Sequence, residues 1–187
     1  MYWNHAGAVN TDETIRITIE RAVELGVRHL IVATCSGANI KKVLERKTDL
    51  NIIAVTHHVG FDGPGVDEMT ESVRAELQAQ GVKILTTTHL LAGVDRAVRI
   101  QFGGLYPAEL IAQSLRMFGQ GVKVAIEIAV MALDAGLIPC GEDVISIGGT
   151  ATGADASLLI CPAHSNKFFQ TEVREIICMP RNKQIKG

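Results

Sequence analysis

Short apolar runs alternate with longer amphipathic stretches in the first part of the chain. Residues 29–33 (HLIVA) and 51–56 (NIIAVT) are continuous apolar runs, typical of strands that are buried on both faces of a parallel sheet. Apolar residues recur at helical spacing from Ile15 to Val23, and Gly26 follows as a helix stop. These patterns predict a helix followed by two buried strands.

The same criteria predict the remaining elements. We expect helices over about 38–46, 67–80, 93–99, 107–117 and 121–135, and strands over 82–86, 142–147, 156–161 and 173–179. Alternation of strands and helices predicts a single three-layer α/β/α domain, 1–187, with a mostly parallel sheet. The last strands are joined without helices, so we also expect an antiparallel strand at an edge of the sheet.

Composition and charge narrow the classes of partner. Apolar residues make up 47% of the chain and the net charge is -2, so nothing indicates nucleic-acid binding. No apolar stretch reaches the ~20 residues of a membrane span, and no export signal is evident at the start. The four cysteines are far apart and contain no C-x-x-C pair, which predicts reduced thiols and a cytoplasmic location.

The first candidate binding element is the loop after strand 29–33. It comprises Thr34, Cys35, Ser36, Gly37, Ala38 and Asn39, and is called the 34–39 loop below. It leads from the carboxyl end of a buried strand into a helix, where free N–H groups and the helix dipole favour an anion. Thr34 and Ser36 add hydroxyls, and Gly37 allows close approach of a ligand. The alternative is that Ser36 only caps the helix and Gly37 only makes the turn.

A second glycine-rich loop follows strand 142–147 and is called the 149–155 loop below. Its candidate ligand-binding residues are Gly149, Thr150, Thr152, Gly153 and Asp155. Small and hydroxyl residues between glycines offer N–H groups and space for a phosphate or a planar ring. Asp155 could accept a hydrogen bond from a ribityl or sugar hydroxyl. Equally, the loop could be a simple turn in which Asp155 bonds its own backbone.

Strand 51–56 ends in Thr56 and is followed by His57, and we expect both residues to contact the same ligand. His57, His58 and His89 raise the question of a metal, but adjacent residues of an extended chain point to opposite sides. No nearby cysteine or carboxylate completes a ligand spacing, so we predict no metal site. Phe61 could stack on a flavin or nucleobase, or pack on the core.

Four further residues are candidates for chemistry. Lys123 and Glu127 lie at i, i+4 on an apolar helix and are expected to form a partly buried ion pair, although Lys123 could instead be a catalytic amine. Arg116 could meet a phosphate. Cys35 at a helix start could be reactive, but no partner for it can be assigned from spacing.

Two segments resemble the C-terminal domain of pyruvate kinase. In that domain a strand ending in Thr-x-Ser-Gly leads through a helix to an I-I-A-V-T strand, as residues 31–37 (IVATCSG) and 51–56 do here. Residues 144–149, the glycine-rich turn through 153 and residues 156–160 resemble its later strand, effector loop and final strand. The resemblance is good over 28–56, moderate over 143–161 and weak between them, where this chain has extra residues around 87–140.

This resemblance implies a function as well as a fold. In pyruvate kinase the first loop forms part of the pocket for a phosphorylated allosteric effector. Ala38 and Asn39 stand where the family usually has an Arg or a small hydroxyl residue, and the catalytic barrel is absent, so kinase activity is not implied. The chain is more similar to a stand-alone archaeal and bacterial group of pyruvate-kinase α/β-domain-like proteins. That similarity implies bound flavin mononucleotide (FMN) with its phosphate on the 34–39 loop.

The leading hypothesis is therefore a binding protein for a phosphorylated small molecule, with FMN preferred. The alternatives are an enzyme, either a flavin-dependent oxidoreductase or a hydrolase using Cys35, and an interaction module in which the 34–39 loop is only a cap. The apolar residues over 107–135 could bury against a second subunit or fill the core, so a homo-oligomer is a further alternative.

Overall fold

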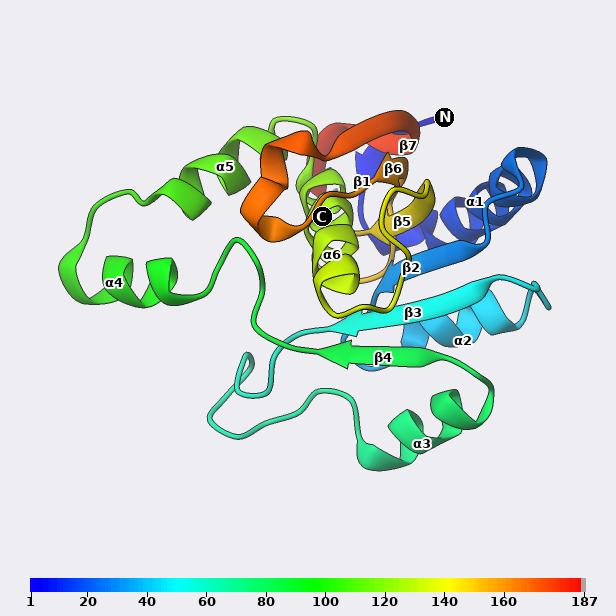
Figure 1. Ribbon diagram of the computed structural model, residues 1–187, viewed down its shortest axis with the longest axis horizontal. Coiled ribbons are helices and arrows are strands. Elements are labelled where there is room, and N and C mark those ends of the chain that lie inside the picture. Colours follow the sequence, from blue (N-terminus) through cyan, green and yellow to red (C-terminus); the bar gives the residue numbers. More distant parts are fainter. Residues whose placement is uncertain (186–187) are drawn as a thin grey trace.

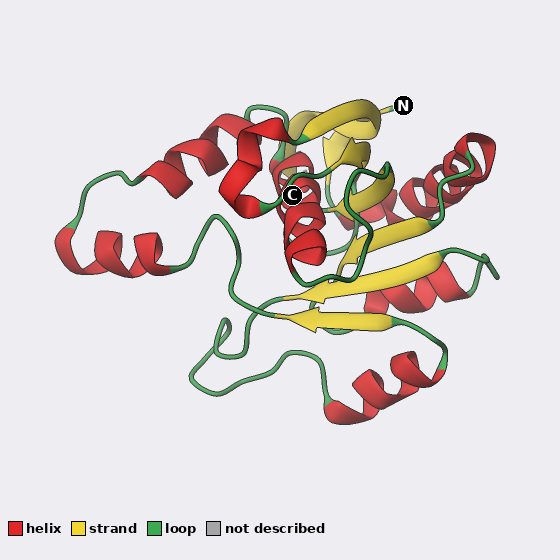
Figure 2. Cartoon of the chain, viewed as in Figure 1, coloured by secondary structure: helices red, strands yellow, loops and turns green. Residues whose placement is uncertain are grey.

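The computed structural model describes residues 1–185 and contains seven strands and six α-helices in that range (Figures 1 and 2). The strands are β1 (Tyr2–Ala6), β2 (His29–Ala33), β3 (Asn51–Thr56), β4 (Lys83–Thr86), β5 (Val144–Gly148), β6 (Ala156–Cys161) and β7 (Glu172–Ile185). The helices are α1 (Thr11–Leu25), α2 (Ala38–Leu44), α3 (Glu71–Ala79), α4 (Val94–Phe102), α5 (Pro107–Arg116) and α6 (Gln120–Asp134), with short 3-10 turns η1 (Ala8–Asn10) and η2 (Ser165–Gln170). Every predicted helix and strand is present. Strand β1 was not predicted.

The strands form one mostly parallel sheet in the order β1-β7-β6-β5-β2-β3-β4. Within the run β5-β2-β3-β4, every strand is parallel to the next. Strand β6 is antiparallel to both β5 and β7, and β1 pairs parallel to β7. The reversed strand therefore lies inside the sheet rather than at an edge, because β7 and β1 extend the sheet beyond it.

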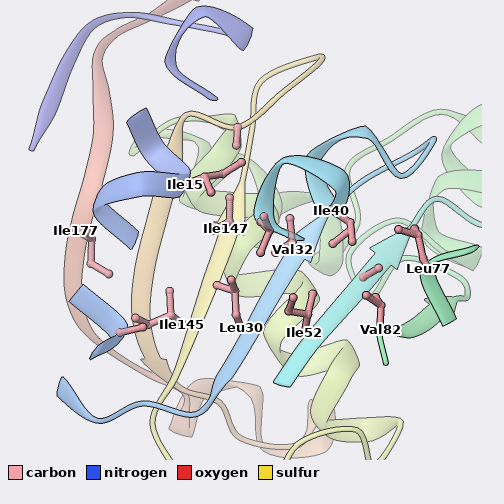
Figure 3. Packing of buried hydrophobic residues seen from close by; sticks show 14 of the residues in the cluster. Ile15, Leu30, Val32, Ile40, Ile52, Leu77, Val82, Ile145, Ile147 and Ile177 are labelled. Carbon is pink, nitrogen blue, oxygen red and sulfur yellow. The ribbon is translucent and has the colours of Figure 1, made fainter. Parts of the chain in front are cut away.

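Helices cover both faces of the sheet and enclose two apolar cores. On one face, α1, α2 and α3 contribute Ile15, Ile40 and Leu77 to a core with Leu30 and Val32 of β2 (Figure 3). On the other face, α6 packs on alternate residues of the same strands, and almost all of its side chains from residue 121 to residue 133 are buried. The predicted three-layer α/β/α architecture is confirmed.

Helix α4 extends away from the sheet, and α5 connects it to α6 (Figure 1). None of the residues of α4 is buried, and its Val94, Ile100 and Phe102 are exposed. The homo-oligomer stays a prediction. Among residues 1–185, no helix combines the length and the apolar character that crossing a membrane requires.

Candidate functional site

The 34–39 and 149–155 loops follow two neighbouring strands, at the point in the sheet where the connecting helices change from one face to the other. Strands β2 and β5 are adjacent and parallel, so their carboxyl ends meet at one edge of the sheet. After β2 the chain enters α2 on one face, whereas β5 is preceded by α6 on the opposite face. In open α/β sheets, ligands bind at the carboxyl ends of strands beside such a switch point.

A cavity of about 500 Å³ lies at this point. Most of its wall comes from loops after β2, β3 and β5 and from one side of α6. The lining residues are Ala33, Thr34, Cys35, Ser36, Ala38, Asn39, Val55, Thr56, His57, Phe61, His89, Ala92, Arg96, Arg116, Gln120, Lys123, Val124, Glu127, Ile128, Gly149, Ala151, Thr152 and Gly153. The size is typical of sites for small molecules and cofactors.

The 34–39 loop forms a tight turn into α2. The Gly37 amide donates to Thr34 Oγ1 at 3.0 Å, and Gly37 has φ +90°, which favours glycine. A Cβ at Gly37 would lie 2.8 Å from Val73 Cγ1 of α3. Gly37 therefore allows close packing on α3 and is not among the cavity-lining residues, whereas Ser36 and Ala38 are exposed on the cavity side.

Asn39 joins the two loops. Its side-chain Nδ2 donates to the carbonyl oxygen of Ala33 at 2.9 Å and to that of Gly153 at 3.1 Å. Gly153 has φ +75°, and a Cβ there would lie 2.3 Å from Thr11 Oγ1. The 149–155 loop is thus held between α1 and the 34–39 loop, with Gly149 and Thr152 left on the cavity wall.

Asp155 and Thr150 do not line this cavity. Asp155 is fully buried, and its Oδ2 accepts a hydrogen bond from the Gly7 amide at 2.9 Å. Burial raises the pKa of this carboxyl, and hydrogen bonds from Thr150 and from the Gly7 amide oppose the rise. Asp155 thus bonds the segment that follows β1 and also Thr150 of its own loop, as the simple-turn alternative expects, and it does not line the cavity.

A thiol, an imidazole and a carboxylate meet at the ends of β2 and β3. Cys35 Sγ lies 3.4 Å from His57 Nδ1, and Glu68 Oε2 lies 2.6 Å from the same nitrogen. Burial and the nearby Glu68 carboxylate raise the pKa of Cys35 to about 11, so the thiol is protonated at neutral pH. The ring of His57 stacks on Phe61 with centroids 3.8 Å apart.

Lys123 and Glu127 form the expected ion pair on the α6 wall. Their side chains are only 5% and 4% exposed, and Glu127 Oε1 also accepts from the Leu91 amide at 2.7 Å. Burial lowers the pKa of Lys123, although Glu127 opposes this. The neighbouring His89 is neutral, because burial lowers its pKa to about 4.

Two arginines give the cavity its free positive charge. Arg96 of α4 and Arg116 of α5 line the wall and are half-buried. Within residues 1–185 neither forms an ion pair, and Arg116 Nε donates only to Gln120 Oε1 at 2.7 Å. Unpaired guanidinium groups in a partly buried cavity favour an anionic ligand.

The structure brings together ten of the thirteen residues predicted to bind the ligand. The exceptions are Gly37, Thr150 and Asp155, which lie beside the cavity without lining it. Sequence reasoning missed Arg96 and Glu68. Both lie in segments that carry no motif, although Glu68 is only 11 residues from His57.

The comparison with protein families agrees with this architecture. The family described as "Pyruvate kinase, alpha/beta domain" matches residues 12–159, most of the chain. Among solved structures, a pyruvate kinase from Cryptosporidium parvum is similar at 17% sequence identity and a TM-score of 0.42. That match covers 81% of this chain and 22% of that one. Cryptosporidium parvum pyruvate kinase in complex with ADP matches at 16% identity and a TM-score of 0.41, covering 79% of this chain and 22% of that one.

Proposed function

This chain belongs to the pyruvate kinase alpha/beta domain family, and we propose that it binds a phosphorylated small molecule, with FMN the preferred ligand. The observation that carries the proposal is the cavity at the β2–β5 switch point, lined by both glycine-containing loops and by two unpaired arginines. The chain spans about a fifth of the length of the pyruvate kinases it matches. Kinase activity forms no part of the proposal.

The cavity offers suitable groups for a phosphate. The amides in the first turn of a helix lack intrahelical acceptors, and α2 begins at Ala38 on the cavity wall. The exposed Ser36 hydroxyl adds a donor. Arg96 and Arg116 can add charge-assisted hydrogen bonds from the α4–α5 side. These groups support a phosphate on the 34–39 loop.

Other parts of the wall suit a flat ring. Val55, Val124 and Ile128 are apolar, and the stacked His57 and Phe61 rings also line the cavity. Apolar walls with a few polar groups are usual for cofactor sites. When bound, a flavin would supply redox chemistry of its own, while this chain would bind and orient it.

The first experiment is an absorption spectrum of the purified protein, with mass spectrometry of whatever heat releases. A flavin spectrum and released FMN are the expected result. A colourless protein that releases nothing would exclude a tightly held flavin, and would leave a weaker phosphorylated ligand to be sought by thermal-shift screening.

The role of the phosphate is tested by comparing FMN with riboflavin, which lacks it. We expect FMN to bind flavin-free protein more tightly, because charge-assisted hydrogen bonds contribute about 1.5–3 kcal/mol, or roughly 10- to 100-fold. Arg96→Gln and Arg116→Gln should weaken FMN binding and leave riboflavin binding unchanged. Arg174→Gln is the control, since Arg174 pairs with Asp143 outside the cavity. Equal affinities for FMN and riboflavin would contradict the proposal.

A second candidate function is a hydrolase that uses Cys35, favoured by the 3.4 Å contact of its sulfur with His57. The raised pKa of Cys35 opposes it. The sulfur lies nearest to Nδ1, the nitrogen that Glu68 also contacts, and 3.7 Å from the opposite Nε2. Activity that is lost in Cys35→Ala would favour the hydrolase. Bleaching of a bound flavin by a physiological reductant would instead favour an oxidoreductase.

The interaction module remains the third alternative. It predicts that Ser36→Ala changes no ligand affinity. Gly37→Val is not a suitable test, because its side chain would clash with Val73 of α3 and would perturb the fold whether or not a ligand binds.

A further inference from the structure

The cluster of Cys35, His57 and Glu68 contains the ligand types of a zinc site. One potential ligand atom from each residue lies within 4.8 Å of the other two. We propose that these three residues bind a divalent zinc ion at the rim of the cavity. This proposal is independent of the ligand inferred above, because the cluster needs neither a phosphate nor a flavin.

Two of the three distances between the ligand atoms require only a small rearrangement, and the third, between Cys35 and Glu68, is within 4.8 Å. Tetrahedral zinc with Zn–S near 2.3 Å and Zn–N near 2.0 Å sets the sulfur and nitrogen about 3.5 Å apart, and Cys35 Sγ lies 3.4 Å from His57 Nδ1. The same geometry sets nitrogen and oxygen about 3.3 Å apart. Glu68 Oε2 is at 2.6 Å, the distance of a hydrogen bond. Metal binding therefore requires the release to solvent of that proton and of the Cys35 thiol proton, and a short retreat of the Glu68 carboxylate.

Each ligand sits on a constrained segment but remains reachable. Cys35 follows the buried β2, and His57 follows β3 with its ring stacked on Phe61. Glu68 precedes Met69, which is 1% exposed and anchors the segment before α3. The side chains of His57 and Glu68 are 30% and 26% exposed, so an ion can enter from solvent.

The choice of zinc follows from the donor atoms. Thiolate and imidazole suit zinc, whereas magnesium and calcium require oxygen ligands. Three protein ligands leave the fourth tetrahedral position open, as in catalytic rather than structural zinc sites. Cys35 and His57 both line the cavity. Water or an oxygen atom of a molecule in the cavity can therefore complete the coordination.

Metal binding is measured on flavin-free protein by titration with zinc against a chromogenic chelator, and by the absorption of the cobalt-substituted protein. We expect one tightly bound ion and a thiolate-to-cobalt charge-transfer band. Cys35→Ser should abolish the band. Cys35→Ser and Glu68→Gln should each weaken zinc binding by at least about tenfold, since loss of even an outer-shell partner typically has that effect.

The matched controls are Cys140→Ser and His164→Gln. Cys140 is exposed outside the cavity, and His164 bonds Asp134 elsewhere on the surface. Both should retain full zinc affinity. If the Cys35 variant fails to fold, wild-type protein still gives an answer, because bound zinc should protect Cys35 from alkylation as mapped by mass spectrometry.

Two outcomes would overturn the proposal. The first is the absence of stoichiometric zinc or cobalt binding to folded protein. The second is zinc binding whose affinity Cys35→Ser and Glu68→Gln leave unchanged, or zinc binding that does not protect Cys35 from alkylation. Either result would indicate an adventitious ion only. Neither result depends on whether FMN binds.

Discussion

Polar residues at the strand ends hold loops together, whether they line the cavity, as Asn39 does, or lie outside it, as Asp155 does. Asn39 bonds both Ala33 and Gly153, and Asp155 bonds the Gly7 amide. Unpaired buried polar groups are costly, so these contacts constrain where the loops lie. Residue type at a strand end therefore indicates a loop with ordered polar groups, but it does not say which groups meet the ligand.

The buried carboxyl of Asp155 leads to a prediction about pH. Its pKa in the folded state is raised above the ordinary 3.8. At pH values between these two pKa values, the folded protein keeps a proton that the unfolded chain has lost. The stability from this group is complete below pH 3.8 and is lost as the pH rises through the folded-state pKa. Asparagine cannot ionise and can still accept from Gly7. The free energy of unfolding of Asp155→Asn should therefore increase relative to that of the wild type as the pH rises.

Urea unfolding of both proteins between about pH 4 and pH 8 measures this difference. Parallel pH profiles would contradict a raised pKa. A constant offset would instead reflect only the changed hydrogen bonding of the amide.

At the scale of elements, close packing of α6 on β5 places the start of the 149–155 loop. A Cβ at Gly148 would lie 2.1 Å from the carbonyl oxygen of Gly121 and 2.9 Å from the amide nitrogen of Ala125. Ser146 of β5 also donates to the Ala125 carbonyl at 2.7 Å. Because α6 carries Lys123 and Glu127, the same packing sets one wall of the cavity.

Gly148→Ala should therefore destabilise the protein by about 1–3 kcal/mol, the usual range for overpacking a tight contact. Gly63→Ala is the matched control, because the nearest atom to its Cβ is Val66 Cγ2 at an ordinary 3.5 Å. The control should change stability by less than about 0.5 kcal/mol. Urea unfolding measures both. Equal effects would mean that α6 can shift away from β5 without strain.

Most elements were predictable because their periodicity is local. Strands β2 and β3 were predicted at their observed limits, and α3 begins at Glu71 instead of residue 67 because Thr70 caps it through its hydroxyl. Strand β1 (YWNHA) was missed because it is short and largely exposed. Its pairing with β7 comes from the far end of the chain, so no local pattern could indicate it.

At the scale of the whole molecule, the sheet separates two cores that share the same strands. Ile15 of α1 belongs to one core and Ile126 of α6 to the other. Because the side chains of a strand alternate between faces, strands β2 to β7 contribute to both cores. Unfolding of either core should therefore disrupt the whole sheet.

Ile15→Val and Ile126→Val are expected to lower the free energy of unfolding by about 0.5–1.5 kcal/mol each. The double variant should show the sum within about 0.5 kcal/mol, because the two sites lie on opposite faces and share no side-chain neighbours. All variants should unfold in one transition. Chemical denaturation followed by circular dichroism tests this. Strong non-additivity, or two transitions, would contradict a single sheet with two independent faces.

The sequence by itself determined the six helices and every strand except β1 within residues 1–185, the three-layer class and the two loops at strand ends. These depend on spacing over a few residues, and strand-end loops of parallel strands must share one edge of the sheet. Only the tertiary structure decided that Glu68 meets Cys35 and His57, that Arg96 enters the cavity, and that Asp155 turns away from it. Those contacts join segments that lie apart in the sequence and are brought together by packing. No local pattern of apolar residues indicates such a contact.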